Sequence, residues 1–89
     1  MDLFEGYPTG VTHSAEWSLK TWWSVARQQW LVQVEHHIPE RGGWIRAWLI
    51  NAAGNPRAFA SFPCAVRAIE RFLDEPDWTQ CREFPGGVE

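Results

Sequence analysis

The chain has 89 residues, of which 45% are hydrophobic and 21% are charged, and its net charge is −3. This length fits one domain, residues 1–89, and the apolar content excludes an intrinsically disordered chain. The acidic balance disfavours a nucleic-acid-binding protein held mainly by contacts to phosphates. No apolar run reaches the ~18 residues of a membrane-spanning helix.

The first twelve residues, MDLFEGYPTGVT, are acidic and are interrupted by Gly6, Pro8 and Gly10. A signal peptide has a basic start and an apolar core, so this segment does not resemble one, and we expect a cytoplasmic protein. Because glycine and proline interrupt regular structure, residues 1–12 are predicted to be an irregular lead-in.

Residues 14–27 fit two different periodicities. A helix would bring apolar residues together one turn apart, at Leu19, Trp22, Trp23, Ala26 and Trp30. A strand would instead place alternate residues on one face, at Trp17, Leu19, Thr21, Trp23 and Val25. We predict a helix over residues 14–27 and keep a strand as the alternative.

Three later segments have the alternating pattern of half-buried strands. They cover about residues 30–38 (WLVQVEHHI), 44–50 (WIRAWLI) and 57–62 (RAFASF). Turn-forming residues separate them, PERGG at 39–43 and AAGNP at 52–56. These segments predict a three-stranded antiparallel meander.

A helix is predicted over about residues 63–74, PCAVRAIERFLD. Pro63 suits the first turn of a helix, where its missing N–H has no partner to lose, and Pro76 prevents continuation. The apolar stripe of this helix consists of Ala65, Val66, Ile69, Phe72 and Leu73. Residues 76–89 are predicted to be a loosely held tail, anchored by Trp78 and Phe84.

These elements define an α+β domain of two layers, a helix packed on an antiparallel sheet. The order α-β-β-β-α is similar to that of double-stranded-RNA-binding domains, and β-β-β-α looks like the three-stranded DNA readers of recombinase arm domains. The basic cluster with which double-stranded-RNA binders begin their last helix is absent from FPCAVRA. The resemblance is therefore one of topology.

The alternation within the predicted strands gives the sheet two different faces. Small and branched side chains form the face expected to receive the helix: Val32, Val34, Ile45, Ala47, Leu49, Ala58, Ala60 and Phe62. The opposite face mixes aromatic and charged side chains. Either the N-terminal helix covers this second face or the face stays open, since large exposed apolar patches are rare in monomers.

We predict that the mixed face binds a partner, because tryptophan and arginine are enriched in binding hot spots. The predicted partner-binding residues are Trp44, Arg46, Trp48, Arg57 and Phe59, and the secondary candidates are Trp22, Trp23 and Arg41. Arginine is concentrated between residues 41 and 71, where Arg41, Arg46, Arg57, Arg67 and Arg71 are opposed by Glu70 alone. The net charge of −3 favours a protein partner over nucleic acid, and a homodimer through the same face is a variant.

The sequence carries no recognisable motif for catalysis, metal or cofactor binding. Glu35, His36 and His37 are the best metal candidates, but neighbouring residues of a strand point to opposite faces, so His36 cannot join the other two. Cys64 and Cys81 are too few for a disulfide framework and lack zinc-site spacing. We expect no enzyme activity, no metal and no cofactor.

The resulting hypothesis is a non-enzymatic protein-binding module that acts by occupying a partner's surface. In size and composition the chain looks like the small inhibitors that phages and mobile elements direct against host defence complexes, anti-CRISPR proteins among them. The alternative is a nucleic-acid-binding module of the three-stranded-sheet-plus-helix type. That module would place Arg46 and Arg57 on phosphates and stack Trp44 or Trp48 on bases.

Overall fold

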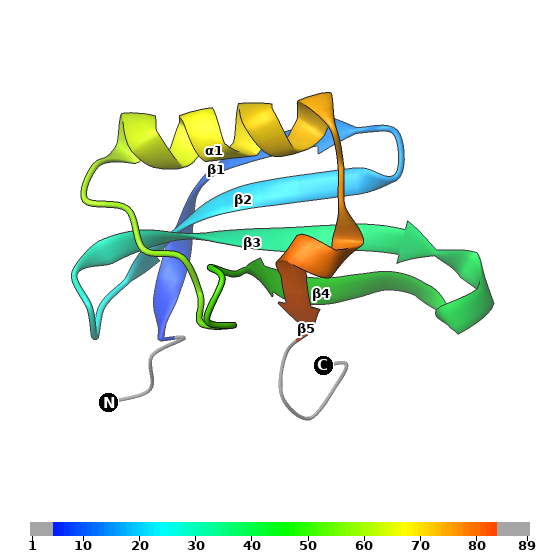
Figure 1. Ribbon diagram of the computed structural model, residues 1–89, viewed down its shortest axis with the longest axis horizontal. Helices are drawn as coiled ribbons and strands as arrows, with labels where there is room; N and C mark the ends of the chain where they lie inside the picture. The colour runs from blue at the N-terminus through cyan, green and yellow to red at the C-terminus, as the bar shows by residue number, and fades with distance from the viewer. Residues whose placement is uncertain (1–4, 84–89) are drawn as a thin grey trace.

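The computed structural model describes residues 5–83, which form a five-stranded antiparallel sheet with one α-helix packed on it (Figure 1). The strands are β1 (Gly6–Ser14), β2 (Trp17–Ser24), β3 (Gln29–Ile38), β4 (Gly43–Leu49) and β5 (Cys81–Glu83), side by side in that order. The remaining elements are helix α1 (Phe62–Asp74) and the short 3₁₀ turns η1 (Pro39–Arg41) and η2 (Trp78–Gln80). The predicted α+β class is confirmed.

The predicted strands at 30–38 and 44–50 are confirmed as β3, which begins one residue earlier, and β4, which is shifted by one residue. They pair antiparallel through the predicted turn, where Gly42 and Gly43 take φ angles of 96° and 125°. A residue with a Cβ is strained at such angles, so these two glycines allow the chain to reverse.

The helix predicted at 63–74 is confirmed as α1, which begins at Phe62. Its N-cap is Ser61, whose side-chain oxygen accepts a hydrogen bond from the backbone N–H of Cys64. Within residues 5–83, no helix combines the length and the apolar character needed to span a bilayer.

The prediction of a helix over 14–27 is wrong, and the alternative is correct, because this segment contains strand β2. Both periodicities bury Leu19, so the apolar pattern alone does not distinguish a helix from a strand. Pairing decides: β2 lies between β1 and β3 and forms a ladder with each of them. Residues 5–83 contain no helix before the first strand, so they do not follow the α-β-β-β-α order of double-stranded-RNA-binding domains.

The irregular lead-in predicted for residues 1–12 is wrong from Gly6 onward, where β1 begins. The strand tolerates its proline because it lies at the sheet edge and because its register shifts between Pro8 and Gly10, a β-bulge. At Gly6 a Cβ atom would overlap the backbone oxygen of Trp23, so glycine permits the close pairing.

The strand predicted at 57–62 does not join the sheet as a ladder. The segment makes one isolated bridge instead, Phe59 with Trp30, and the preceding residue, Pro56, bridges to Ile50. Trp30 and Phe59 exchange both backbone hydrogen bonds, at 2.8 and 2.9 Å, which fixes the segment beside the start of β3.

The place beside β4 is taken by β5, which comes from the segment predicted as a loose tail, 76–89. Turn η2 leads into β5, and its Trp78 packs against the core as predicted. Phe84, the other predicted anchor of the tail, lies outside the described residues. The tail prediction is therefore wrong for residues 78–83.

The main core lies between α1 and the two strands that it packs against, β2 and β3 (Figure 1). Its buried residues are Trp17, Leu19, Val32, Val34, Leu49, Ala65, Ala68, Ile69 and Phe72. The predicted helix-facing positions in β3 and β4 are thus confirmed at Val32, Val34 and Leu49. The core reaches β4 only at one end, because α1 lies over the neighbouring strands.

The sheet face opposite α1 is also partly closed. Leu31 and Gln33 of β3 are buried there, and Trp48 of β4 is only 3% exposed. The ring of Trp48 meets that of Trp22 edge to face, with 5.9 Å between centroids. The prediction that Trp48 offers its ring to a partner is therefore wrong, because the ring is part of the packed interior.

Arg41 of η1 and Glu83 of β5 form a two-pronged ion pair, with nitrogen–oxygen distances of 2.6 and 2.7 Å. This pair joins the β3–β4 turn to the last strand. The hydrogen bonds and charge of Arg41 lower the pKa of the Glu83 carboxyl below its ordinary value. Arg41, a secondary candidate for partner binding, is thus engaged within the fold.

We predict that Trp48→Ala lowers the free energy of unfolding by about 3–5 kcal/mol, the usual cost of emptying a buried aromatic site. Trp44→Ala is the matched control, because Trp44 is 46% exposed, and it should change stability by less than about 1 kcal/mol. Urea unfolding followed by far-UV circular dichroism measures both. Equal losses in the two variants would contradict the burial of Trp48.

We predict that Glu83→Gln lowers the melting temperature at pH 7 and has little effect near pH 2. Because the folded-state pKa is lowered, the ionised carboxyl stabilises the fold above the unfolded pKa, ~4.3, and that contribution is lost as pH falls through the folded value. Melting curves of both proteins across this pH range provide the test. A difference in melting temperature between wild type and Glu83→Gln that grows toward low pH would contradict a stabilising ion pair.

Candidate functional site

The residues predicted to bind a partner do not form one surface. Trp44 and Arg46 are exposed on the face of β4 that points away from α1, and Trp48 is buried beside them. Arg57 and Phe59 lie on the other side of the sheet, next to α1. The prediction grouped them because it treated residues 57–62 as a third strand with the same alternation.

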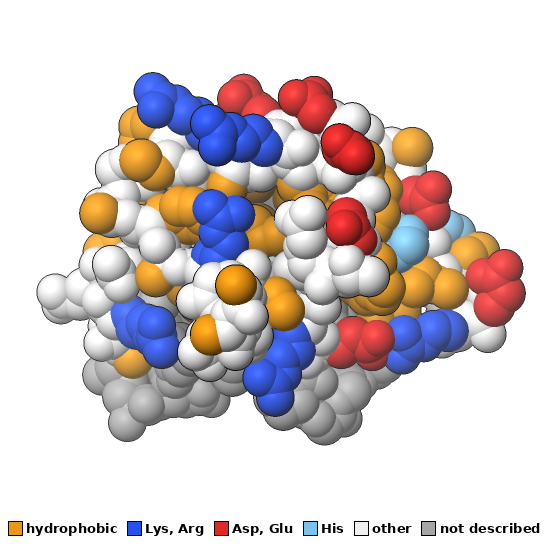
Figure 2. Space-filling view, in the orientation of Figure 1, with side chains coloured by type: hydrophobic (Ala, Val, Ile, Leu, Met, Phe, Trp, Pro, Cys, Tyr) orange, Lys and Arg blue, Asp and Glu red, His pale blue; other side chains and the backbone are white. Residues whose placement is uncertain are grey.

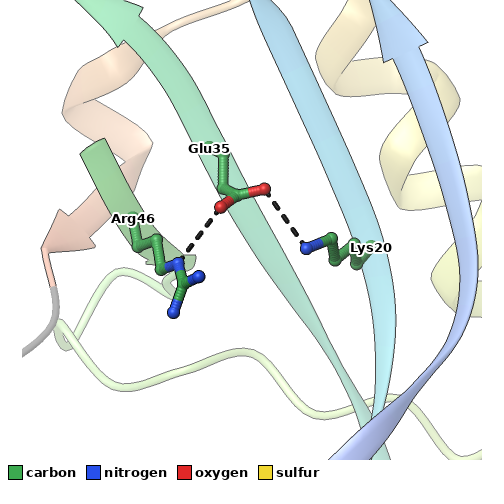
Figure 3. Close-up of polar contacts among 3 residues, drawn as sticks. All are labelled: Lys20, Glu35 and Arg46. Carbon is green, nitrogen blue, oxygen red and sulfur yellow. Dashed lines mark hydrogen bonds and ion pairs between the residues drawn. The ribbon is translucent and has the colours of Figure 1, made fainter. Parts of the chain in front are cut away.

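The face that carries Arg46 contains two ion pairs that share one carboxylate (Figure 3). Glu35 of β3 lies between two cations from the neighbouring strands, 3.3 Å from Lys20 of β2 and 3.1 Å from Arg46 of β4. Glu35 and Arg46 are directly opposite one another in the β3–β4 ladder, so the pairing follows from the register. Arg46 is therefore paired within the fold, through a carboxylate that it shares with Lys20.

The two secondary tryptophans are also occupied by internal packing. Trp22 is half-buried against Trp48. Trp23 is half-buried and meets Trp30 edge to face, with a centroid separation of 4.6 Å. Neither is among the strongly exposed aromatic side chains in the described part of the chain, a group that includes Trp44 and Tyr7.

The three residues of the EHH segment separate as predicted. His36 lies on the α1 side, stacked on Trp17 with ring centroids 3.8 Å apart, and its Nε2 is 2.9 Å from a carboxylate oxygen of Glu16. Glu35 points to the other face, toward Lys20. Within residues 5–83, no group of three His, Cys, Asp or Glu side chains is placed to hold a metal ion.

A groove of about 600 Å³ runs between α1 and the segment 57–59. Its apolar surface comes from Leu49, Phe59, Ala68 and Phe72, and its cationic side chains are Arg57, Arg67 and Arg71. Figure 2 shows this hollow below the helix, with orange side chains on its floor, blue ones around it and red ones toward one end.

The groove exists because α1 packs over β2 and β3 and leaves the β4 side uncovered. Leu49, at the end of β4, then lies at the foot of one flank of the helix. That flank is a single helical stripe, whose members recur every three or four residues: Cys64, Arg67, Ala68, Arg71, Phe72 and Glu75. The bridge between Phe59 and Trp30 holds the opposite wall in place.

The cations of the groove are not neutralised by the fold. Arg57, Arg67 and Arg71 form no ion pair with any residue that the structure describes. The Arg57 guanidinium lies 5.0 Å from the centroid of the Phe59 ring, a cation–π contact that leaves its charge available. Arg67 and Arg71 are one turn apart on α1, so their like charges repel in the absence of a ligand.

Acidic side chains lie at the other end of the groove. Glu75 follows α1, and Asp77 accepts hydrogen bonds from the hydroxyl and the backbone N–H of Thr79. These two bonds lower the pKa of Asp77, which keeps it ionised. The groove is therefore polarised along its length, from arginine to carboxylate.

Comparisons with protein-family models, curated proteins and solved structures gave no match for this chain. The geometry of the site is thus the basis for its interpretation. Sequence reasoning did not select Arg67 and Arg71, which belong to the polar side of the predicted helix. The available signal was the excess of arginine between residues 41 and 71.

We predict that iodoacetamide at pH 8 modifies Cys64 and spares Cys81 in the folded protein. Cys64 is exposed at the groove, whereas burial, with a smaller effect of the Asp77 charge, raises the pKa of Cys81 to about 12. The thiolate fraction of Cys81 at pH 8 is then roughly three orders of magnitude below that of an ordinary thiol.

Peptide mass spectrometry identifies the modified cysteine, and the urea-unfolded chain, in which both residues should react, is the control. Rapid modification of Cys81 in the folded protein would contradict the packing of β5.

Proposed function

We propose that this chain is a non-enzymatic protein-binding module that acts by occupying the surface of a partner protein. The groove supports this proposal, because an apolar floor edged by arginines has the composition of an interface hot spot. Burial of the partly exposed Phe59 ring would contribute to affinity, and the charges would supply specificity and fast association.

The biological role that we propose is inhibition, by a small cytoplasmic protein of a phage or mobile element that binds a host defence complex. A domain of 89 residues that covers a functional surface needs no catalytic machinery of its own. A homodimer would use the exposed Trp44 face instead, and light scattering distinguishes that case by mass.

The nucleic-acid alternative has less support from the positions of its residues. Arg46 is paired with Glu35, and Trp48 is buried, so the pair does not form a cationic stacking platform. In the groove, Glu75 and Asp77 would repel a phosphate backbone that continued past the arginines.

We predict that partner capture from a lysate of the host cell is lost in the double variant Arg67→Glu/Arg71→Glu and survives nuclease treatment. Reversal of two charges would place carboxylates where the partner meets arginines. Quantitative mass spectrometry of the captured proteins measures the loss.

Two variants serve as controls in this capture experiment. Arg27→Glu/Arg82→Glu has the same change in net charge outside the groove, and Trp44→Ala removes the exposed ring on the opposite face. Both should retain the partner. Capture that nuclease abolishes, or no specific capture by the wild-type chain, would contradict the proposed function.

A further inference from the structure

The geometry of the groove points to one class of occupant: an extended segment of the partner, about five residues long, in which acidic residues flank a hydrophobic one. This inference rests on the proposed function and specifies the chemistry of the partner. Its grounds are the length of the groove, the spacing of its cations and the polarity of its ends.

The length of the groove sets the length of the occupant. The helical stripe from Cys64 to Glu75 spans eleven steps of about 1.5 Å, or ~16 Å along the axis of α1. An extended chain advances about 3.3 Å per residue, so roughly five residues cover the groove from one end to the other.

The spacing of the arginines selects an alternating pattern. Arg67 and Arg71 are four residues apart on α1, which separates them by about 6 Å along the helix axis. In an extended peptide, residues i and i+2 point to the same side and lie about 6.6 Å apart. Two carboxylates at i and i+2 therefore match the two guanidinium groups.

The residue between those carboxylates points to the opposite wall of the groove. That wall carries the half-buried ring of Phe59, whereas Leu49 and Phe72, at the floor, are already buried in the core. A leucine, isoleucine or phenylalanine at position i+1 would pack against the exposed part of the Phe59 ring, while the Arg57 guanidinium is available to a further carboxylate. The predicted pattern is acidic–hydrophobic–acidic.

The carboxylates at the end of α1 determine which half of the groove receives the acidic residues of the segment. Glu75 and Asp77 repel acidic residues, so the acidic pair lies in the half of the groove beside Arg67 and Arg71. A neutral or basic residue of the partner suits the other half. A uniformly anionic polymer such as single-stranded nucleic acid meets repulsion there.

A displayed library of random twelve-residue peptides, selected on the wild-type chain, tests this inference. We expect the enriched peptides to contain the acidic–hydrophobic–acidic pattern. A synthetic, fluorescein-labelled copy of an enriched peptide should bind at least about tenfold more weakly to Arg67→Glu/Arg71→Glu, as measured by fluorescence anisotropy. Binding should also weaken as salt rises from 50 to 500 mM.

The matched control is Arg27→Glu/Arg82→Glu, which should bind the same peptide within about twofold of wild type, since neither arginine lines the groove. Far-UV circular dichroism shows whether each variant is folded. Enrichment of neutral or basic peptides, failure to enrich any peptide, or unchanged affinity of the groove variant would overturn the inference.

Two further outcomes separate this inference from the proposed function. If partner capture is lost in Trp44→Ala but kept in Arg67→Glu/Arg71→Glu, the proposed protein-binding function stands. The groove is then not the binding site, and this inference is overturned. A labelled single-stranded DNA that competes with the selected peptide and binds more tightly would overturn the choice of a peptide as occupant.

Discussion

The seating of α1 on the sheet is the constraint on which the rest of the structure depends. At one end of the helix, Phe72 meets the ring of Trp17 edge to face, with centroids 5.0 Å apart. At the other end, Phe62 meets Trp30 at 6.3 Å. Such aromatic pairs contribute about 0.5–1.5 kcal/mol each beyond the area that they bury. Because Trp17 belongs to β2 and Trp30 to β3, the helix lies over those strands and leaves the β4 side open.

This offset gives the two faces of the sheet different electrostatic character. On the face away from α1, Glu35 forms ion pairs with Lys20 and Arg46 on the two neighbouring strands. Beside α1, Arg57, Arg67 and Arg71 have no carboxylate partner among the described residues. A protein with a net charge of −3 thus concentrates unpaired cations around an apolar groove, which is why we assign binding to that side.

The parts of the fold that were predicted correctly are those in which a periodic pattern coincides with a local boundary signal. Strands β3 and β4 alternate on either side of a glycine turn, and α1 begins at a serine cap followed by proline. For β2 the apolar pattern fits a helix and a strand equally well, and pairing with two neighbours decides. β1 and β5 are edge strands that exist through pairing with residues distant in sequence, so local propensity missed them.

The candidate site was predicted less well than the fold, because it depends on contacts between residues that are distant in sequence. Arg67 and Arg71 could be assigned to the exposed side of a helix, but not to a groove. The groove depends on residues 57–59 leaving the sheet to face α1, and a bridge between Phe59 and Trp30 determines that path. Trp48 was wrongly predicted to be exposed. The alternating pattern predicts on which face of the sheet a side chain lies, whereas the burial of Trp48 depends on its packing against Trp22.

The central claim is that the partner occupies the groove beside α1 and not the opposite face of the sheet. Hydroxyl-radical footprinting of the chain with and without its captured partner tests it most directly, because both faces carry oxidisable side chains. The account predicts that oxidation of Phe59 and Cys64 falls on binding while oxidation of Trp44 is unchanged. Protection of Trp44 with no change at Phe59 and Cys64 would contradict it.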